Sequence, residues 1–356
     1  MCHLNSSRTR LCGPRAAASP PGDNPARVAA AGRLLAIAAL FACLAVPGCR
    51  KENGGEAVRG RIGFVQYIDS PMSEDAARGF TEGLAASGLK DGTDYRVESF
   101  SANGDVVTVN SIIDNAVGKD YDLLMVLSSP TLQAALNKVK QTPIVFTVIA
   151  DPIAAGAGKS FTDHLPNVTG IATLGDYEGM ARIVARLLPS VKTVGTLYAP
   201  GEINSVVNKE KLTEYAQQAG ISVVATPVNS TADVADAALS LAGRNVGAIC
   251  QVLSNLTDAA FPTIAQAAQK SRLPLFWFDE KHAAEGPVVT LSRDYVQAGR
   301  DAAAVAVRIL NGESPAGIPF AQVSKSRLII NRRAANSLGI SVPDDLLKQA
   351  DRVIGD

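Results

Sequence analysis

Polar residues that could hold a small solute follow the apolar, β-rich runs of this sequence. Ser129 and Thr131 follow the run at 122–127 and open a predicted helix, and Asn204 and Ser205 take the corresponding place later in the chain. The first N–H groups of a helix have no partner within it and attract anions. Such residues often serve only as helix caps. The alternative is a ligand carboxylate held by one helix end from each half of the chain.

Four further residues stand at the ends of predicted strands or at the helix starts that follow them. Tyr67 could stack against a solute, or pack under a loop. Asp151 and Asp279 could accept hydrogen bonds from an ammonium group, or act as turn and N-cap residues. Asn255 opens a helix and is either a cap or a ligand contact. Because open α/β sheets bind ligands at the carboxyl ends of their strands, these positions are the candidate site.

Residues suited to catalysis or metal binding are too few and too scattered to form a centre. From position 49 onward the only cysteines are Cys49 and Cys250, and the only histidines are His164 and His282. Together they give neither a disulfide framework nor a zinc site. The histidines lack the partner set of a nucleophile or general base. Equal totals of 34 basic and 34 acidic residues argue against a nucleic-acid partner. We expect no catalytic residue, no metal and no cofactor.

The first 60 residues have the order of an export signal followed by an anchor. Several arginines precede an unbroken apolar run at 34–46, which ends in the tetrad VPGC at 46–49. The run is shorter than the roughly 20 residues that span a bilayer. The tetrad resembles the bacterial lipobox, in which the cysteine is lipidated and becomes the new N-terminus. We therefore predict a signal peptide over 1–48 and lipidation at Cys49; the alternative is an incidental cysteine after an ordinary signal peptide.

The remaining chain alternates short β-rich runs with Ala-rich amphipathic stretches, a pattern typical of βαβ units and parallel sheets. The pattern restarts near residue 192, which predicts an α/β fold with two Rossmann-like lobes joined by a multi-strand hinge. Ligands of such proteins bind in the cleft between lobes. The predicted parts are a flexible tether over 49–60, lobe 1 over 61–172 with a return crossover near 275–293, lobe 2 over 173–274 with C-terminal elements from 294–340, and a tail over 341–356.

Six segments spread over residues 61 to 340 also resemble a known family. They are IGFVQYID at 62–69, GFTEGL at 79–84, PIVFTVIADP at 143–152, NVTGI at 167–171, YAPGEINSV at 198–206 and DYVQAGRDAA at 294–303. The chain is similar to the substrate-binding proteins of ABC transporters with the periplasmic binding protein type I fold, among them members that bind tryptophan, tyrosine or phenylalanine.

The resemblance implies roles for individual residues. Tyr67 is similar to the family's cleft aromatic, Ser129 and Thr131 to its helix-end contacts, and Asn204 and Ser205 to its second-lobe carboxylate contacts. Asp279 falls where related binding proteins often place an acid. The implied function is delivery of an amino acid, aromatic ones being favoured, to a permease with its ATPase. We expect an exported monomeric lipoprotein in the cell envelope, facing the periplasm or the exterior.

Two other functions are compatible with the same pattern. A sensory lipoprotein would present its ligand to a receptor, and the sequence barely separates this function from transport. An enzyme of similar fold, such as a racemase, would need an acid–base group from each lobe. Cys250 has no second cysteine to pair with in such a mechanism, and we therefore expect a binding protein.

Overall fold

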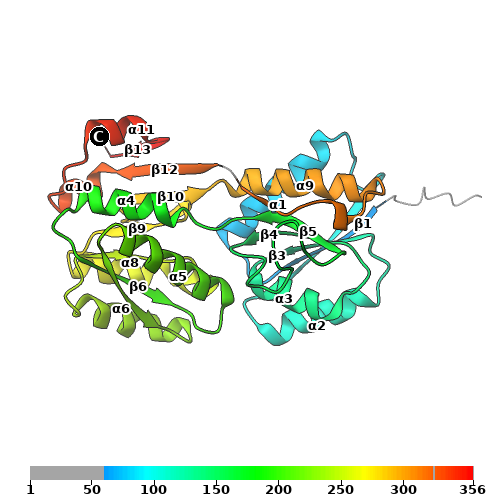
Figure 1. The fold of residues 1–356 in the computed structure, drawn as a ribbon, viewed down its shortest axis with the longest axis horizontal. Helices are drawn as coiled ribbons and strands as arrows, with labels where there is room; N and C mark the ends of the chain where they lie inside the picture. The colour runs from blue at the N-terminus through cyan, green and yellow to red at the C-terminus, as the bar shows by residue number, and fades with distance from the viewer. Residues whose placement is uncertain (1–59, 324, 356) are drawn as a thin grey trace, which may run out of the picture. The chain divides into compact units, whose positions relative to one another are not determined.

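The computed structural model describes residues 60–323 and 325–355, which form two parallel-type sheets covered by helices. Cys49 and the expected signal peptide lie outside the described residues. Within this part of the chain, no helix combines the length and apolar character needed to cross a membrane. The α/β fold with two lobes predicted from the sequence is confirmed (Figure 1).

Lobe 1 is built on a six-stranded, entirely parallel sheet with strand order β11-β5-β4-β3-β1-β2. Helices α1 and α9 cover one face and α2 and α3 cover the other (Figure 1). The elements are β1 Gly60–Gln66, α1 Pro71–Ala86, β2 Tyr95–Ser101, α2 Val106–Val117, β3 Leu123–Leu127, α3 Ser129–Lys138, β4 Ile144–Ile149, β5 Val168–Ala172, α9 Tyr295–Leu310, η3 Pro315–Gly317 and β11 Ala321–Gln322. Strands β3 and β5 are buried along their whole length, as expected for a parallel sheet with helices on both faces.

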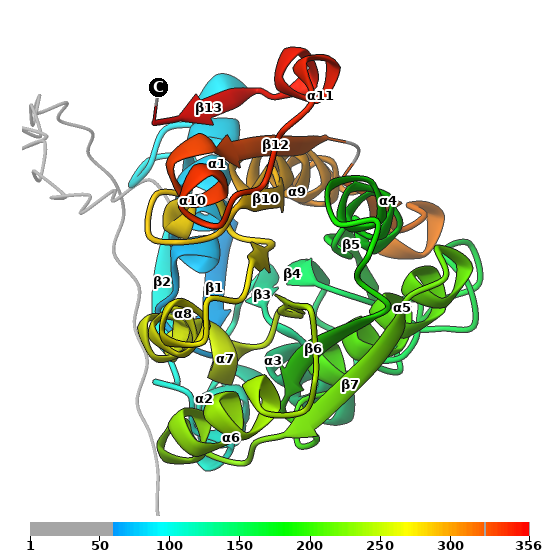
Figure 2. The same cartoon turned by 90° about the vertical axis from the view of Figure 1, so that its left-hand side faces the viewer.

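Lobe 2 is built on a seven-stranded sheet with strand order β13-β12-β10-β9-β8-β6-β7, in which only β10 and β12 run antiparallel. Figure 2 shows α4 and α5 on one side of this sheet and α6 and α8 on the other. The elements are α4 Tyr177–Leu187, β6 Thr193–Tyr198, α5 Ile203–Gln218, β7 Ser222–Pro227, η1 Thr231–Asp233, α6 Val234–Ala242, β8 Ala248–Cys250, α7 Asn255–Ala259, α8 Phe261–Lys270, β9 Leu275–Trp277, η2 Glu280–His282, β10 Val289–Arg293, β12 Ser326–Asn331, α10 Arg332–Ser337, α11 Asp344–Gln349 and β13 Arg352–Ile354.

The structure differs from the sequence assignment in the last third of the chain. Strands β9 and β10 belong to the sheet of lobe 2, although 275–293 was expected as a crossover of lobe 1. Helix α9, expected in lobe 2, packs on α1 in lobe 1. The segment 341–356, predicted as a tail, contains strand β13, which pairs with β12 in the sheet of lobe 2. Hydrophobic periodicity identifies an element but says nothing about which sheet it joins, because strand partners are distant in the sequence.

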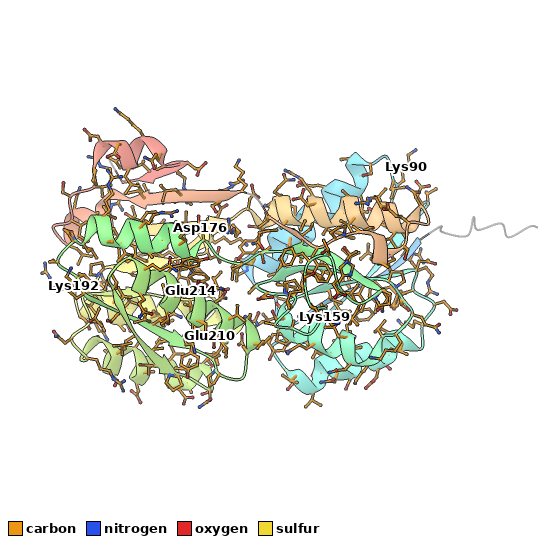
Figure 3. The ribbon with its side chains drawn as sticks, in the orientation of Figure 1. Lys90, Lys159, Asp176, Lys192, Glu210 and Glu214 are labelled. Carbon is orange, nitrogen blue, oxygen red and sulfur yellow. The ribbon has the colours of Figure 1, made fainter. Side chains whose placement is uncertain are left out.

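Three crossovers connect the lobes, after β5, after β10 and after β11. Arg293 joins all three, since its Nε donates to the carbonyl of Leu174 at 2.7 Å and its Nη1 donates to Ser326 Oγ at 2.7 Å. Asp176, labelled in Figure 3, begins α4 directly after the first crossover by accepting the N–H of Gly179. The predicted multi-strand hinge therefore exists, with one guanidinium group at its centre.

Helices α1 and α9 approach so closely that glycine is required where they touch. A Cβ at Gly299 would stand 2.1 Å from the carbonyl oxygen of Ala76. The obstructing atom belongs to the backbone, so Gly299→Ala must push the helices apart. We expect the free energy of unfolding to fall by roughly 1–3 kcal/mol, although alanine favours helices. Urea denaturation checks this against Gly317→Ala, where no atom lies within 4 Å; equal midpoints for the two variants would contradict it.

Candidate solute-binding cleft

A cavity lies between the lobes at the carboxyl ends of the strands. About 360 Å³ of space free of protein atoms, part of it open to solvent, lies among its lining residues. Lobe 1 contributes residues that follow β3, β4 and β5, and lobe 2 contributes α5 and the segment after β8. The lining residues are Met72, Ser128, Val148, Ala150, Thr173, Asn204, Asn208, Leu253, Ser254, Asn255 and Tyr295.

Two asparagines of α5 carry the buried acceptors of this cavity. Asn204 and Asn208 lie one turn apart on the same helix face. Asn208 donates its amide group to the carbonyl of Leu253 at 2.9 Å, and Asn204 donates to Glu202 Oε2 at 3.3 Å. The Oδ1 atoms of both are buried without a hydrogen-bond partner among the described residues. A buried acceptor without a donor is costly, so this pair suits an ammonium group, which has three donors.

The opposite face of α5 has a different character. Glu210 and Glu214, labelled in Figure 3, are exposed and lie one turn apart. Both side chains face solvent, and neither lines the cavity. Helix α5 thus presents amides to the cleft and carboxylates to solvent, and no charged side chain lines the cavity among the described residues.

Glu202 occupies the N-terminus of α7. Its carboxylate accepts the N–H of Asn255 at 2.8 Å, the N–H of Leu256 at 2.9 Å and the side-chain amide of Asn255 at 2.9 Å. Burial raises the pKa of the Glu202 carboxyl, while these hydrogen bonds oppose the shift. The helix end in lobe 2 therefore already holds an internal carboxylate.

The N-terminus of α3 in lobe 1 holds no such group. Ser128, its N-cap residue, has φ of 75° and its Oγ lies 3.1 Å from Asn255 Oδ1, across the cleft. The hydroxyls of Ser129 and Thr131 in the first turn are buried without a partner among the described residues, and this turn has no acidic side chain. The free N–H groups of this turn favour an anion.

A second backbone irregularity borders the cavity at β4. Val148 has φ of 57°, a conformation that a β-branched residue rarely adopts. The pairing register of β4 with β5 shifts at this point, between Phe146 and Ile149. Strained residues such as Ser128 and Val148 cluster at binding sites, where the surrounding structure holds them in place.

The structure brings only some of the predicted site residues to the cavity. Asn204 and Asn255 line it. The other predicted residues lie outside its lining and have structural contacts or deeper positions. Ser205 Oγ accepts the N–H of Ala199 at 2.8 Å, and Asp151 accepts the N–H groups of Ile153 and Ala154 within a turn. Tyr67, Ser129, Thr131 and Asp279 are buried and are not among the lining residues.

Several lining residues escaped the sequence analysis. Asn208 could have been found, because it follows Asn204 by four positions on a predicted helix. Tyr295 and Thr173 gave a weaker signal, since each stands directly beside a crossover. Met72 and Val148 gave none, because an apolar residue that lines a cleft has the same pattern as one in the core.

Two α/β lobes, three crossovers and a cavity with amide, hydroxyl and apolar walls define a two-lobed solute-binding protein. The family model described as ABC transporter substrate binding protein matches residues 61–354. The chain belongs to this family. It is a substrate-binding protein rather than an enzyme, and such proteins of ABC transporters act outside the cytoplasm.

Three similar proteins support the assignment. A tyrosine-binding protein of Clostridioides difficile (strain R20291) is 27% identical over 314 residues, which cover 85% of this chain and 91% of that protein. The structure of an ABC domain from Streptococcus pneumonia in complex with L-Trp has 28% identity and a TM-score of 0.79, covering 83% of this chain and 99% of that one. The ligand-free, open structure of a substrate binding protein from Clostridium difficile has 27% identity and a TM-score of 0.65, covering 83% and 100%.

Proposed function

We propose that the chain is the lipid-anchored solute receptor of an ABC importer and binds an aromatic amino acid between its lobes. The observation that carries the proposal is the pair of unpartnered acceptors on Asn204 and Asn208, within a cavity that also borders the free N-terminus of α3. An α-amino acid has an ammonium group for the first feature and a carboxylate for the second. The permease and its ATPase are the implied partners.

The apolar walls favour a large side chain on the solute. Met72 and Val148 from lobe 1 and Leu253 from lobe 2 line the cavity, together with the ring of Tyr295. An aromatic ring packs well against such groups, and its burial adds binding energy in proportion to the apolar area removed from water.

The relatives favour the same class of solute. One is named a tyrosine-binding protein and another was solved with L-Trp. The fit to the L-Trp complex, with a TM-score of 0.79, is better than the fit to the ligand-free open structure, at 0.65, although identity and coverage are nearly equal. The lobe arrangement is therefore more similar to that of the L-Trp complex than to that of the open relative.

A ligand screen by thermal shift tests the proposal. With L-tryptophan, L-tyrosine or L-phenylalanine at 100 times the dissociation constant, the apparent stability should rise by about 2.7 kcal/mol. Tryptamine, which lacks the carboxylate, and indole-3-propionate, which lacks the ammonium group, should each produce a much smaller shift. A shift with arabinose or inositol and none with any amino acid would refute the proposed solute class.

The anchor has its own test. Cys49→Ser removes the sulfur that the lipid would modify, so this variant should not incorporate a radiolabelled fatty acid that labels the wild type. Cys250→Ser is the matched control, because Cys250 is buried in the second lobe and remains unmodified in this proposal. Equal fatty-acid labelling of Cys49→Ser and the wild type would exclude lipidation at this position.

A further inference from the structure

Two aspartates and a histidine meet inside lobe 2, outside the lining of the cleft. Asp258 lies on α7, Asp279 follows β9 and His282 lies in η2. One potential ligand atom from each residue lies within 4.8 Å of the others. Asp258 is 5% exposed and Asp279 is 2% exposed, so both carboxyl groups are nearly removed from solvent.

The hydrogen bonds around this cluster leave two carboxyl oxygens without partners. Asp279 Oδ1 accepts the N–H of Lys281 at 3.1 Å, but Asp279 Oδ2 and Asp258 Oδ1 are buried without a partner among the described residues. The nearby ammonium group of Lys281 pairs instead with Glu74, at 2.9 Å from Nζ to Oε2. Two adjacent buried carboxyl groups require a cation or a proton between them, because burying uncompensated charge is very costly.

His282 is oriented as a metal-binding histidine usually is. Its Nδ1 lies 3.2 Å from Glu285 Oε2, and its ring stacks on Phe261 with 3.9 Å between the ring centroids. A carboxylate on one ring nitrogen fixes the tautomer and leaves the other nitrogen to bind a metal. Nε2 is therefore the atom of His282 available to the two aspartates.

We propose that Asp258, Asp279 and His282 form a binding site for a divalent transition-metal ion, and that Zn²⁺ is the ion that the site binds most tightly. Two carboxylate oxygens and one imidazole nitrogen suit this ion, whereas Ca²⁺ and Mg²⁺ prefer oxygen ligands alone. Asp258 stands three residues after the cleft residue Asn255 on the short helix α7. A bound ion would tie this helix to the loop after β9 and so support one wall of the cleft.

The spacing in the sequence conceals this site. Asp258 is separated from Asp279 by α8 and β9, and only the return of β9 beside β8 brings the two together. A search for clustered cysteines and histidines passes over it, because two of the three ligands are aspartates.

Zinc titration of the untagged, EDTA-treated protein tests the site. We expect one Zn²⁺ per chain, and Co²⁺ in its place should give the visible absorption of a coordinated ion. His282→Phe keeps the stacking on Phe261 but removes the ligand nitrogen, so the Zn²⁺ affinity should fall at least tenfold. His164→Phe is the matched control, since His164 stacks on Phe320 in the same manner. The Zn²⁺ affinity of this variant should equal that of the wild type.

A second variant tests whether a loss of Zn²⁺ binding could result from misfolding. Asp258→Asn preserves the size of the side chain and should also weaken Zn²⁺ binding at least tenfold, with an unchanged circular dichroism spectrum. Absence of stoichiometric Zn²⁺ binding to the wild type would mean that only a proton compensates the two acids, and would overturn the proposal. So would equal affinity in the wild type and His282→Phe.

Discussion

In buffer containing EDTA, Asp258→Asn is expected to raise the free energy of unfolding by about 2–4 kcal/mol at pH 8 and to change it little at pH 4. Burial, and next the charge of Asp279, raise the pKa of Asp258 from 3.8 to about 8. Each tenfold change in a protonation equilibrium is worth about 1.4 kcal/mol, and relaxation around the charge reduces the full amount. The neutral amide avoids the cost of a buried charge and can donate to the unpartnered oxygen of Asp279.

The sign of the effect follows from proton binding. Between pH 4 and pH 8 the folded protein retains a proton at Asp258 that the unfolded chain releases, so stability falls as the pH rises through this window. The variant lacks the contribution of Asp258 to this dependence, whereas Asp279 and Glu202, whose pKa values burial also raises, keep theirs. Urea denaturation at pH 4, 6 and 8 measures it, with Asp236→Asn on the exposed side of α6 as the control. A gain in stability that is equal at pH 4 and pH 8 would rule out the titration of Asp258 as its cause.

Asn204→Ala is expected to weaken the binding of the best amino-acid ligand by roughly 10- to 100-fold. The substitution removes a buried acceptor for the ammonium group, and hydrogen bonds to charged groups contribute about 1.5–3 kcal/mol. Calorimetric titration measures the affinity, with Asn137→Ala on the exposed side of α3 as the control.

A ligand without the ammonium group separates binding from structure. Indole-3-propionate should bind the wild type and Asn204→Ala with similar affinity, because it offers nothing to the missing acceptor. If the affinities for amino acid and analogue fall by the same factor, Asn204 acts by shaping the cleft and not by contacting the ammonium group.

The fold was predictable because its signal is local and repeated. Buried parallel strands such as β3 produce short apolar runs, and the restart of the pattern near residue 192 indicated a second lobe. The sheet membership of β9, β10 and α9 was not predictable, because it depends on pairing between segments that are remote in the sequence.

The candidate site was predictable only in part. Strand ends and helix starts led to Asn204 and Asn255, both of which line the cavity. The sequence could not reveal that Glu202 fills the N-terminus of α7. With that helix end occupied, lobe 2 offers buried acceptors through Asn204 and Asn208. We therefore assign the ammonium group to lobe 2, where the sequence favoured the carboxylate.

Calorimetric titration of the mature protein with L-tryptophan, L-tyrosine and L-phenylalanine tests the proposed solute class most directly. We predict one site per chain and, for at least one of the three, binding about a hundredfold tighter than that of tryptamine or indole-3-propionate, because each analogue lacks one of the two charged groups that the cleft accommodates. Tight binding of either analogue, or of a sugar, without measurable binding of any of the three amino acids would contradict the prediction.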